Sequence, residues 1–232
     1  MEWRKWEDLP KGMQLPEVRE YYDILNRRQF SLKCKRAFDV AAASVMLVAL
    51  SPVFLVLAAA IKLDSPGPVF YRQERITQYG KKFRIYKFRT MVNNADKVGA
   101  AVTVGNDSRI TRVGAKIRDY RLDEIGQLIN VLKGEMSFVG TRPEVLKYVK
   151  RYTPEMRATL LLPAGITSEA SIRYKDESEL LDAADDVDKV YVEKVLPGKM
   201  KWNLDSIRKF SFMREILTMF RTAAAVMGKE YE

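Results

Sequence analysis

A long apolar run stands out in the pattern of this chain and extends from Phe38 to Lys62. As a straight helix, residues 40–61 would reach about 33 Å at about 1.5 Å per residue, close to the roughly 30 Å hydrocarbon core of a bilayer. The run therefore predicts a membrane element. The alternative is a buried core helix of a soluble protein, but such helices are usually shorter and less uniformly apolar.

Ser51 and Pro52 stand near the middle of this run. Pro52 has no backbone N–H to donate, and its ring collides with the carbonyl of Val48, so the helix should bend there. The Ser51 hydroxyl can bond back to the preceding turn and limit the loss. These two residues predict a helix-break-helix element rather than a straight span.

Both flanks of the run are basic, and the positive-inside rule then favours both ends on the cytoplasmic side. A re-entrant element that enters, bends at the break and returns satisfies this rule. Asp39, at the entry, is costly in lipid unless it is paired. We expect its partner to be Lys35, Arg36 or a residue from elsewhere. The flanking cations are Lys33, Lys35 and Arg36 before the run and Lys62, Arg72 and Arg75 after it.

The remaining pattern predicts short strands and several helices. Apolar and basic residues alternate over residues 69–75 and 82–89, which predicts a β-hairpin that turns at residues 79–81. Residues 109–118 should form a helix behind an N-cap at Asp107 or Ser108, and residues 122–132 a second helix that stops at Gly134. Further helices are expected at residues 143–152 and 154–161.

An apolar stripe near the end of the chain predicts an amphipathic helix with a basic opposite face. Such a helix can lie in the membrane interface or pack on the core, and the pattern leaves both open. A shorter amphipathic segment is expected near residues 18–25. The stripe consists of Ile207, Phe210, Met213, Ile216, Leu217 and Phe220.

Composition limits the possible chemistry. The chain has no histidine and a single cysteine, Cys34, so imidazole mechanisms and an intrachain disulfide are excluded. The net charge is +10, and the excess of Lys and Arg lies between Val69 and Arg121. Lipid head groups, nucleic acid or a phosphorylated small substrate could be the target. Nucleic acid is the weakest of these, because no motif for it is present.

Asp123 and Glu124 are the candidate reactive groups. They stand at the start of a predicted helix and close to Arg118 and Arg121, which favours their ionised forms. Neighbours on a helix diverge by about 100°, so the pair cannot share one proton, but one carboxylate could attack while the other binds a divalent cation or orients the first. By itself, an acidic pair at a helix start is usually only a preference for the positive end of the helix dipole.

Several motifs, taken together and in order, resemble the bacterial sugar transferases, and more narrowly the small monotopic polyprenol-phosphate phosphoglycosyl transferases. The resemblance covers about residues 33 to 166. It rests on Lys35-Arg36-x-x-Asp39, the Ser51-Pro52 break, Tyr86 to Met91, and the long block from Arg118 to Pro143 that contains Leu122-Asp123-Glu124 and Gly140-Thr141-Arg142-Pro143.

This resemblance implies transfer of a sugar 1-phosphate from a nucleotide diphosphate sugar, a UDP-sugar, to undecaprenyl phosphate, with Mg²⁺ and release of a nucleoside monophosphate. The reaction is the first membrane step of a glycan synthesis. Asp123 would form an aspartyl-phosphosugar intermediate, and Asp123 and Glu124 would bind the metal. The cations expected around the phosphates are Lys87, Arg89, Arg118 and Arg142.

The expected fold is α+β and mostly helical, with a re-entrant membrane element, a short β-hairpin and interfacial amphipathic helices. We divide the chain into an N-terminal amphipathic segment (1–34), a re-entrant membrane helix (35–62) and a cytosolic catalytic domain with C-terminal interfacial helices (63–232). The expected place is the cytosolic face of the bacterial cytoplasmic membrane, as a monotopic protein. Membrane lipids are expected partners and nucleic acid is not, while an oligomer and contacts with downstream glycosyltransferases stay open.

The sequence leaves open the donor sugar and a non-enzymatic function. Many relatives carry a Gly-Trp-Ala-Gln stretch where this chain has Ser168-Glu-Ala-Ser-Ile-Arg173, so the donor sugar is not predicted. A non-enzymatic adaptor that binds anionic lipid and recruits a polysaccharide synthesis complex would also explain the basic charge. It would not explain Asp123 and Glu124.

Overall fold

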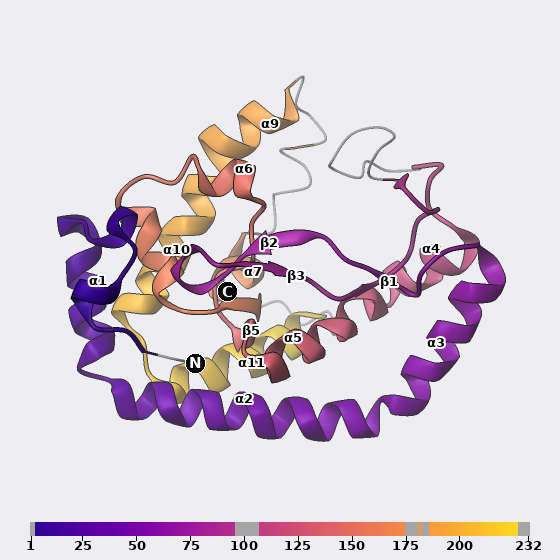
Figure 1. The fold of residues 1–232 in the computed structure, drawn as a ribbon, viewed down its shortest axis with the longest axis horizontal. Helices are drawn as coiled ribbons and strands as arrows, with labels where there is room; N and C mark the ends of the chain where they lie inside the picture. The colour runs from indigo at the N-terminus through magenta and orange to yellow at the C-terminus, as the bar shows by residue number, and fades with distance from the viewer. Residues whose placement is uncertain (1–2, 96–106, 175–180, 182–185, 227–232) are drawn as a thin grey trace.

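The computed structural model describes residues 3–95, 107–174, 181 and 186–226. Two consecutive helices, α2 (Gln29–Ala49) and α3 (Ser51–Asp64), form a bent arm along one edge of the molecule, and most other elements lie on its inner side (Figure 1). The N-terminal segment, with η1 (Trp6–Asp8), η2 (Lys11–Met13) and α1 (Pro16–Asn26), packs at the end of the molecule where α2 begins.

The predicted break at Ser51 and Pro52 is confirmed. The axes of α2 and α3 differ by 60°, and the Ser51 hydroxyl donates to the carbonyl of Val48 over 2.8 Å. Over the described parts of the chain, no single helix has the length and hydropathy needed to cross a membrane. Helices α2 and α3 taken together have both.

The bent arm has two different faces. Its inner face packs against the rest of the fold through Ala43 of α2 and through Leu57 and Ile61 of α3, all of which are buried. Its outer face carries large apolar side chains that are mostly exposed. These exposed side chains are Phe30, Val45, Val48, Leu55, Val56 and Leu63.

The predicted hairpin is also confirmed. Strand β1 (Phe70–Tyr71) pairs antiparallel with β4 (Lys87–Phe88). Strand β2 (Glu74–Ile76) pairs antiparallel with β3 (Lys82–Arg84), and the two pairs continue one register. The chain turns through η3 (Gln78–Gly80), where Tyr79 and Gly80 both have positive φ. The hairpin runs across the molecule above the arm (Figure 1).

The predictions for the next two helices were partly wrong. Helix α4 (Arg112–Asp119) begins three residues later than expected, because Thr111 is its N-cap and accepts from the Gly114 amide over 3.0 Å. The Asp107 carboxylate binds Arg109 instead. The second helix begins as a 3-10 turn, η5 (Leu122–Gly126), before α5 (Gln127–Lys133), and it ends as predicted at Gly134, whose φ is +79°.

A two-stranded parallel sheet forms the centre of the fold, with β5 (Met136–Val139) beside β6 (Ala164–Thr167). Between these strands, the helix predicted at residues 143–152 shortens to α6 (Leu146–Val149), and the one predicted at residues 154–161 is confirmed over nearly its whole length, as the 3-10 helix η6 (Glu155–Leu161). The elements after the sheet are α7 (Glu169–Arg173), α9 (Val187–Val190), the π-helical η7 (Tyr191–Val195), α10 (Leu196–Arg208) and α11 (Phe212–Val226).

The predicted C-terminal stripe is divided between two helices. Ile207 and Phe210, at and just after the end of α10, are buried in the core with α1 and η6. Met213, Leu217 and Phe220 of α11 are exposed, by 72%, 47% and 70%. Core packing is therefore confirmed for the first part of the stripe, while a place in the membrane interface stays a prediction for the part on α11. The α+β, mostly helical class with short strands is confirmed.

Candidate active site

The acidic pair lies in the 3-10 turn between α4 and α5. Arg121 adopts a left-handed conformation with φ of +52°, which turns the chain sharply from α4 into η5. Gly126 then lets the turn approach β4 closely, since a Cβ at this position would lie 2.9 Å from the carbonyl oxygen of Tyr86. This close approach brings Asp123 and Glu124 beside the next residue of the hairpin, Lys87.

Glu124 is held by two cations from different elements. Its Oε1 accepts from Lys87 Nζ of β4 over 2.7 Å and from Arg142 Nη2, just beyond β5, over 2.9 Å. Burial raises the pKa of Glu124, but Arg142 and Lys87 outweigh burial and bring the pKa down to about 2. Glu124 is therefore a fixed anion that joins the hairpin, the 3-10 turn and the loop after β5.

Asp123 has a different environment. Within the described residues, no other side chain donates a hydrogen bond to its carboxylate. Burial raises its pKa, Lys87 opposes this, and the negative charge of Glu124 raises the pKa further. The positive charge of Arg118 also lowers the pKa of Asp123. Asp123 is the carboxylate of the pair whose oxygens are left for another group to approach.

The predicted phosphate-binding cations do not all reach this site. Lys87 and Arg142 meet at Glu124, and Arg118 lies alongside, with its Nε donating to Thr90 Oγ1 over 2.9 Å. Arg89 is 5% exposed, and its guanidinium donates to the carbonyls of Ser65 and Pro66 over 2.8 Å each. It thus ties the end of α3 to the hairpin instead of facing the acidic pair.

The predicted metal ligands can be tested by their chemistry. No group of three or more His, Cys, Asp or Glu side chains that could hold a metal occurs within the described ranges. Asp123 and Glu124 offer two adjacent carboxylates. Mg²⁺ is commonly held by one or two carboxylates and completed by water and substrate phosphates. The donor set fits a magnesium ion that is shared with a phosphorylated ligand.

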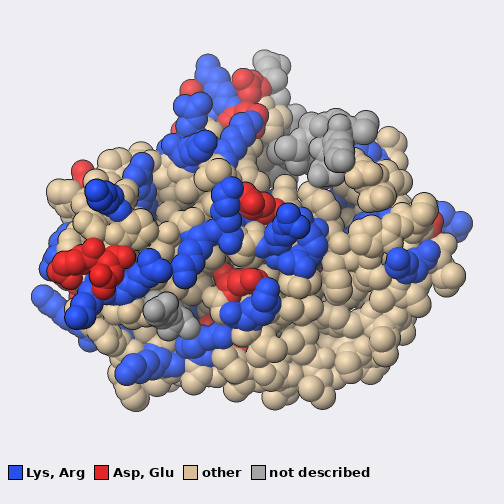
Figure 2. Space-filling view, in the orientation of Figure 1, with Lys and Arg blue, Asp and Glu red and all other residues tan. Residues whose placement is uncertain are grey.

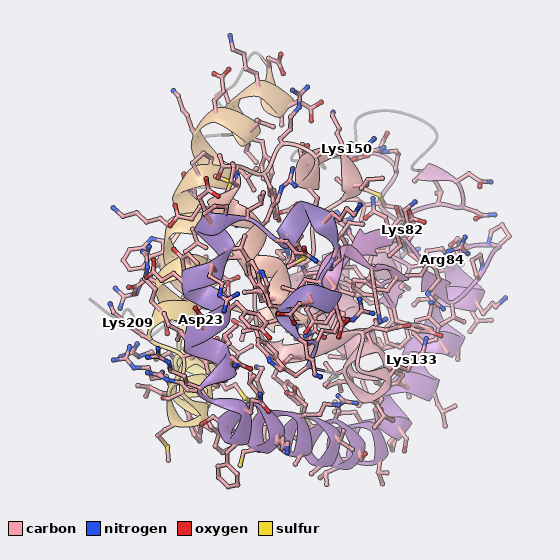
Figure 3. The ribbon with its side chains drawn as sticks, turned by 60° about the vertical axis from the view of Figure 1, so that its left-hand side comes forward. Asp23, Lys82, Arg84, Lys133, Lys150 and Lys209 are labelled. Carbon is pink, nitrogen blue, oxygen red and sulfur yellow. The ribbon has the colours of Figure 1, made fainter. Side chains whose placement is uncertain are left out.

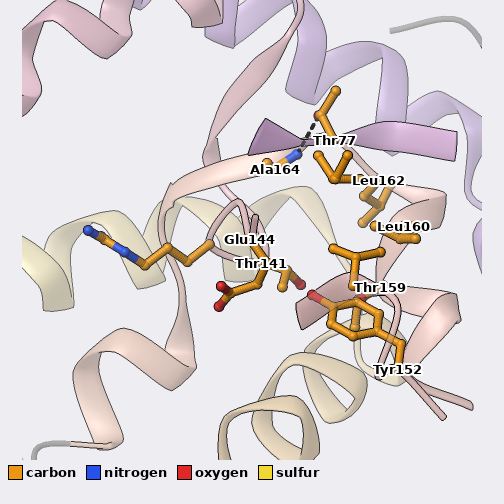
Figure 4. Close-up of a pocket in the computed structure, with 11 residues that line it drawn as sticks. Thr77, Thr141, Glu144, Tyr152, Thr159, Leu160, Leu162 and Ala164 are labelled. Carbon is orange, nitrogen blue, oxygen red and sulfur yellow. Dashed lines mark hydrogen bonds between the residues drawn. The ribbon is translucent and has the colours of Figure 1, made fainter. Parts of the chain in front are cut away.

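Sequence reasoning missed a small pocket of mixed polar and apolar lining beside the Arg142 loop. Thr141 and Glu144 line it from that loop, with Tyr152 and Thr159 opposite (Figure 4). Glu144 is buried and accepts from the Tyr191 hydroxyl over 2.5 Å. No signal in the sequence could have revealed this contact, because the two partners are far apart in the chain and neither belongs to a recognisable motif.

The surface around these elements is divided by charge. Lys and Arg gather over the middle and upper part of the face in Figure 2, next to small acidic patches, and few charged side chains appear at its lower right, where the arm bends. Ser51 and Pro52 belong to that bend.

The family model described as bacterial sugar transferase matches residues 30–229. The chain is 35% identical over 196 residues to the UDP-N-acetylgalactosamine-undecaprenyl-phosphate N-acetylgalactosaminephosphotransferase of Aeromonas hydrophila, which covers 83% of this chain and 43% of that protein. It is 37% identical over 193 residues to the UDP-glucose:undecaprenyl-phosphate glucose-1-phosphate transferase of Escherichia coli, with 81% and 39% covered.

A third relative is covered more fully. The UDP-glucose:undecaprenyl-phosphate glucose-1-phosphate transferase of Caulobacter vibrioides is 34% identical over 197 residues, which are 83% of this chain and 69% of that protein. In contrast, the chain matches only about two fifths of the length of the first two relatives. In all three, the matched part spans most of this chain, which includes the elements that carry the acidic pair.

Proposed function

The chain belongs to the bacterial sugar transferase family, and on this basis we propose that it transfers a sugar 1-phosphate from a UDP-sugar to undecaprenyl phosphate. The three relatives carry these two substrates in their names. The observation that supports the proposal most is the asymmetry of the acidic pair. One carboxylate is held by two cations, whereas its half-buried neighbour accepts no hydrogen bond from another side chain among the described residues and has a raised pKa.

In the first half of the proposed reaction, a carboxylate oxygen of Asp123 attacks the phosphorus that bears the sugar. A bond forms between Asp123 and this phosphorus, and the bond to the bridging oxygen of the diphosphate breaks. The electron pair leaves with that oxygen on uridine monophosphate. A carboxylate can act as nucleophile here because phosphoryl transfer depends chiefly on in-line positioning and on neutralising phosphate charge.

In the second half, an oxygen of undecaprenyl phosphate attacks the same phosphorus. The bond to Asp123 breaks, the carboxylate is restored, and the products are undecaprenyl diphosphate sugar and free enzyme. No proton has to be moved by an imidazole, which is consistent with a chain that has no histidine.

Fixed cations in the site would stabilise the charge of both transition states. Lys87 and Arg142 are held in place by Glu124, and the positive charge of Arg118 acts on Asp123. Preorganised cations of this kind stabilise developing charge without reorganising during the reaction. Magnesium, held by Asp123 and Glu124 together with the diphosphate, would neutralise further phosphate charge.

The proposal places the bent arm in the cytosolic leaflet of the membrane. The exposed apolar side chains of α2 and α3 and those of α11 would then contact lipid, and both ends of the arm would stay on the cytosolic side. This arrangement brings a soluble donor and a lipid-bound phosphate to one interface.

Mass spectrometry of protein incubated with donor alone tests the proposal. We expect a phosphosugar adduct on the peptide that contains Asp123, and uridine monophosphate released in equal amount. Asp123→Asn should lose both signals. Asp119→Asn, an exposed aspartate at the end of α4, is the matched control and should keep them. An adduct on Glu124, or turnover that needs both substrates at once with no adduct, would falsify the assignment.

The second candidate function is a lipid-binding adaptor, which the exposed apolar faces of the arm and α11 favour. The same pair of variants separates the two functions. An adaptor with Asp123→Asn would still support polysaccharide synthesis in cells, whereas the enzyme would not.

A further inference from the structure

Three charged residues on one turn of α2 point into the fold instead of toward the outer face. Lys35 and Asp39 are each 2% exposed, and Arg36 is half-buried. Residues three and four apart lie on the same side of a helix, so the three side chains form one group. We call this group the α2 clamp. Nearly all its hydrogen bonds go to main-chain groups of β5 and α5.

The clamp occupies the open edge of β5. One edge of this strand pairs with β6, and a strand edge without a partner leaves N–H and C=O groups unpaired. On the open edge, the Phe138 amide donates to Asp39 Oδ1 over 3.2 Å, and the Val139 carbonyl accepts from Lys35 Nζ over 2.7 Å. A carboxylate and an ammonium group thus stand where a third strand would be. Lys35 also pairs with Glu215 of α11.

Arg36 holds the end of α5 in a similar way. The last carbonyls of a helix have no partner within it, and they form its negative end. Arg36 donates from Nη1 to the Val131 carbonyl over 2.7 Å and from Nη2 to the Leu132 carbonyl over 2.8 Å. The next residue, Lys133, ends α5 and lies between the hairpin residues Lys82 and Arg84 and the bent arm (Figure 3).

The two clamped elements carry the two halves of the candidate active site. Helix α5 continues directly from the turn that holds Asp123 and Glu124, and β5 leads within three residues to Arg142. The salt bridge between Glu124 and Arg142 joins the turn before α5 directly to the loop after β5. We propose that the α2 clamp positions the acidic pair and Arg142 against each other and fixes their height above the membrane arm. The inference rests on the proposed function.

Substitutions at all three residues test the clamp, and those of Lys35 and Arg36 each have a matched control on an exposed residue of the same type. Lys35→Met removes the ammonium and keeps most of the apolar volume, with Lys33→Met as its control. Arg36→Gln removes the guanidinium, with Arg27→Gln as its control. Both controls lie at exposed positions near the clamp. Asp39→Asn keeps an oxygen that can accept from the Phe138 amide, whereas Asp39→Ala does not.

We expect kcat to fall on the order of 10²-fold in Lys35→Met, Arg36→Gln and Asp39→Ala, since a displacement of about 1 Å can cost that much. The KM for the donor should change by less than about threefold, because the donor-binding cations stay. Asp39→Asn should keep kcat within about fivefold of the parent protein, and both controls should match it. Hydrogen exchange should become faster in the peptide with Phe138 for Asp39→Ala and stay slow for Lys33→Met.

The outcomes are separable. Because the Arg36 side chain is only half-buried, the Arg36→Gln protein should fold. Unchanged kcat in this variant would overturn the proposal even if Lys35→Met failed to fold. Equal losses in Asp39→Asn and Asp39→Ala would also overturn it. If the parent protein shows neither adduct nor turnover, the proposed function fails. Hydrogen exchange then still decides whether the clamp holds β5, because it needs no activity.

Discussion

Two charged clusters in this molecule are built from similar residues and differ in what they contact. In the α2 clamp, Lys35 and Asp39 are almost fully buried and bind main-chain groups. In the acidic site, Lys87 and Glu124 are each 23% exposed and bind side chains only. Buried charges that bind the backbone fix the arrangement of elements. Partly exposed charges that bind one another are held ready for a ligand.

Asp123 belongs to the acidic site but, among the described residues, accepts no hydrogen bond from another side chain. Its removal should have the largest effect on turnover. Asp123→Asn should lower turnover by about 10⁴-fold or more, the scale seen when a nucleophile is lost. The same change should raise the melting temperature at neutral pH, because burial raises the pKa of this carboxyl and the fold therefore disfavours its ionised form. Thermal melting and donor turnover measured on one preparation check both parts. A lower melting temperature would contradict the comparison.

Glu124 should give the next largest effect, with the opposite sign for stability. Glu124→Gln leaves Lys87 and Arg142 without their shared carboxylate. We expect turnover to fall by about 10² to 10³-fold and the melting temperature to fall as well. The phosphosugar should still be attached to Asp123. Peptide mapping of the trapped protein checks the attachment point, and a shift to another residue would sink the assignment.

Substitutions of Arg89 and Arg118 compare a buried cation that binds the backbone with a cation of the acidic site. Arg89→Met should lower the free energy of unfolding by about 2 kcal/mol, because the carbonyls of Ser65 and Pro66 lose a charged donor. Its turnover per folded molecule should stay near that of the parent protein. Arg118→Met should do the reverse, with turnover about 10²-fold lower and little change in stability. Urea unfolding and kinetics on both variants decide whether each residue is assigned to the right cluster.

The bend of the arm should have a smaller effect on turnover. Replacing Ser51 and Pro52 with Ala and Leu restores a backbone donor and removes the ring, so part of the population should straighten and cross the membrane. Turnover should fall by about the fraction that has crossed. In a Cys34→Ser background, a cysteine at position 5 reports the crossing through its reaction with an impermeant reagent in intact cells. No labelling together with full activity would speak against a re-entrant arm.

Local signals in the sequence were enough to predict several elements. A proline in a helix, a glycine that must adopt positive φ, and alternation in a strand each act within a few residues, so the break at Pro52, the stop at Gly134 and the hairpin could all be predicted. The start of α4 was missed although the signals were local, because Asp107 and Thr111 both suit an N-cap and the Asp107 carboxylate is bound to Arg109.

The site was predictable only where side chains meet side chains within a recognisable motif. Arg89 has the same appearance in the sequence as Lys87, and only the fold shows that its partners are carbonyls at the end of α3. The residues of the α2 clamp belong to a motif, and Asp39 was expected to be paired, but the backbone partners of the clamp could not be predicted for a related reason. Apart from Glu215, these partners are main-chain groups about 100 residues away, and every residue has such groups, so no pattern of residue types marks them.

The smallest expected effect is the pH dependence of stability, which compares the two carboxylates of the pair. The pKa of Glu124 is depressed from 4.5 to about 2. Its contribution to stability is therefore complete above about pH 4.5 and is lost as the pH falls toward 2. The pKa of Asp123 is raised above 3.8. Its protonated form is favoured by the fold, so its contribution is present below pH 3.8 and is lost as the pH rises through its folded value.

Melting curves of the parent protein, Glu124→Gln and Asp123→Asn across pH 2 to 7 can separate these two contributions. The deficit of Glu124→Gln should be largest at neutral pH and shrink below about pH 4.5. The advantage of Asp123→Asn should be smallest at low pH and grow as the pH rises through the folded pKa of Asp123. The same ionisation should limit turnover on the acidic side, because only the carboxylate form of Asp123 can attack phosphorus. If both differences changed in the same direction with pH, the two carboxylates would not have the separate environments that the site gives them.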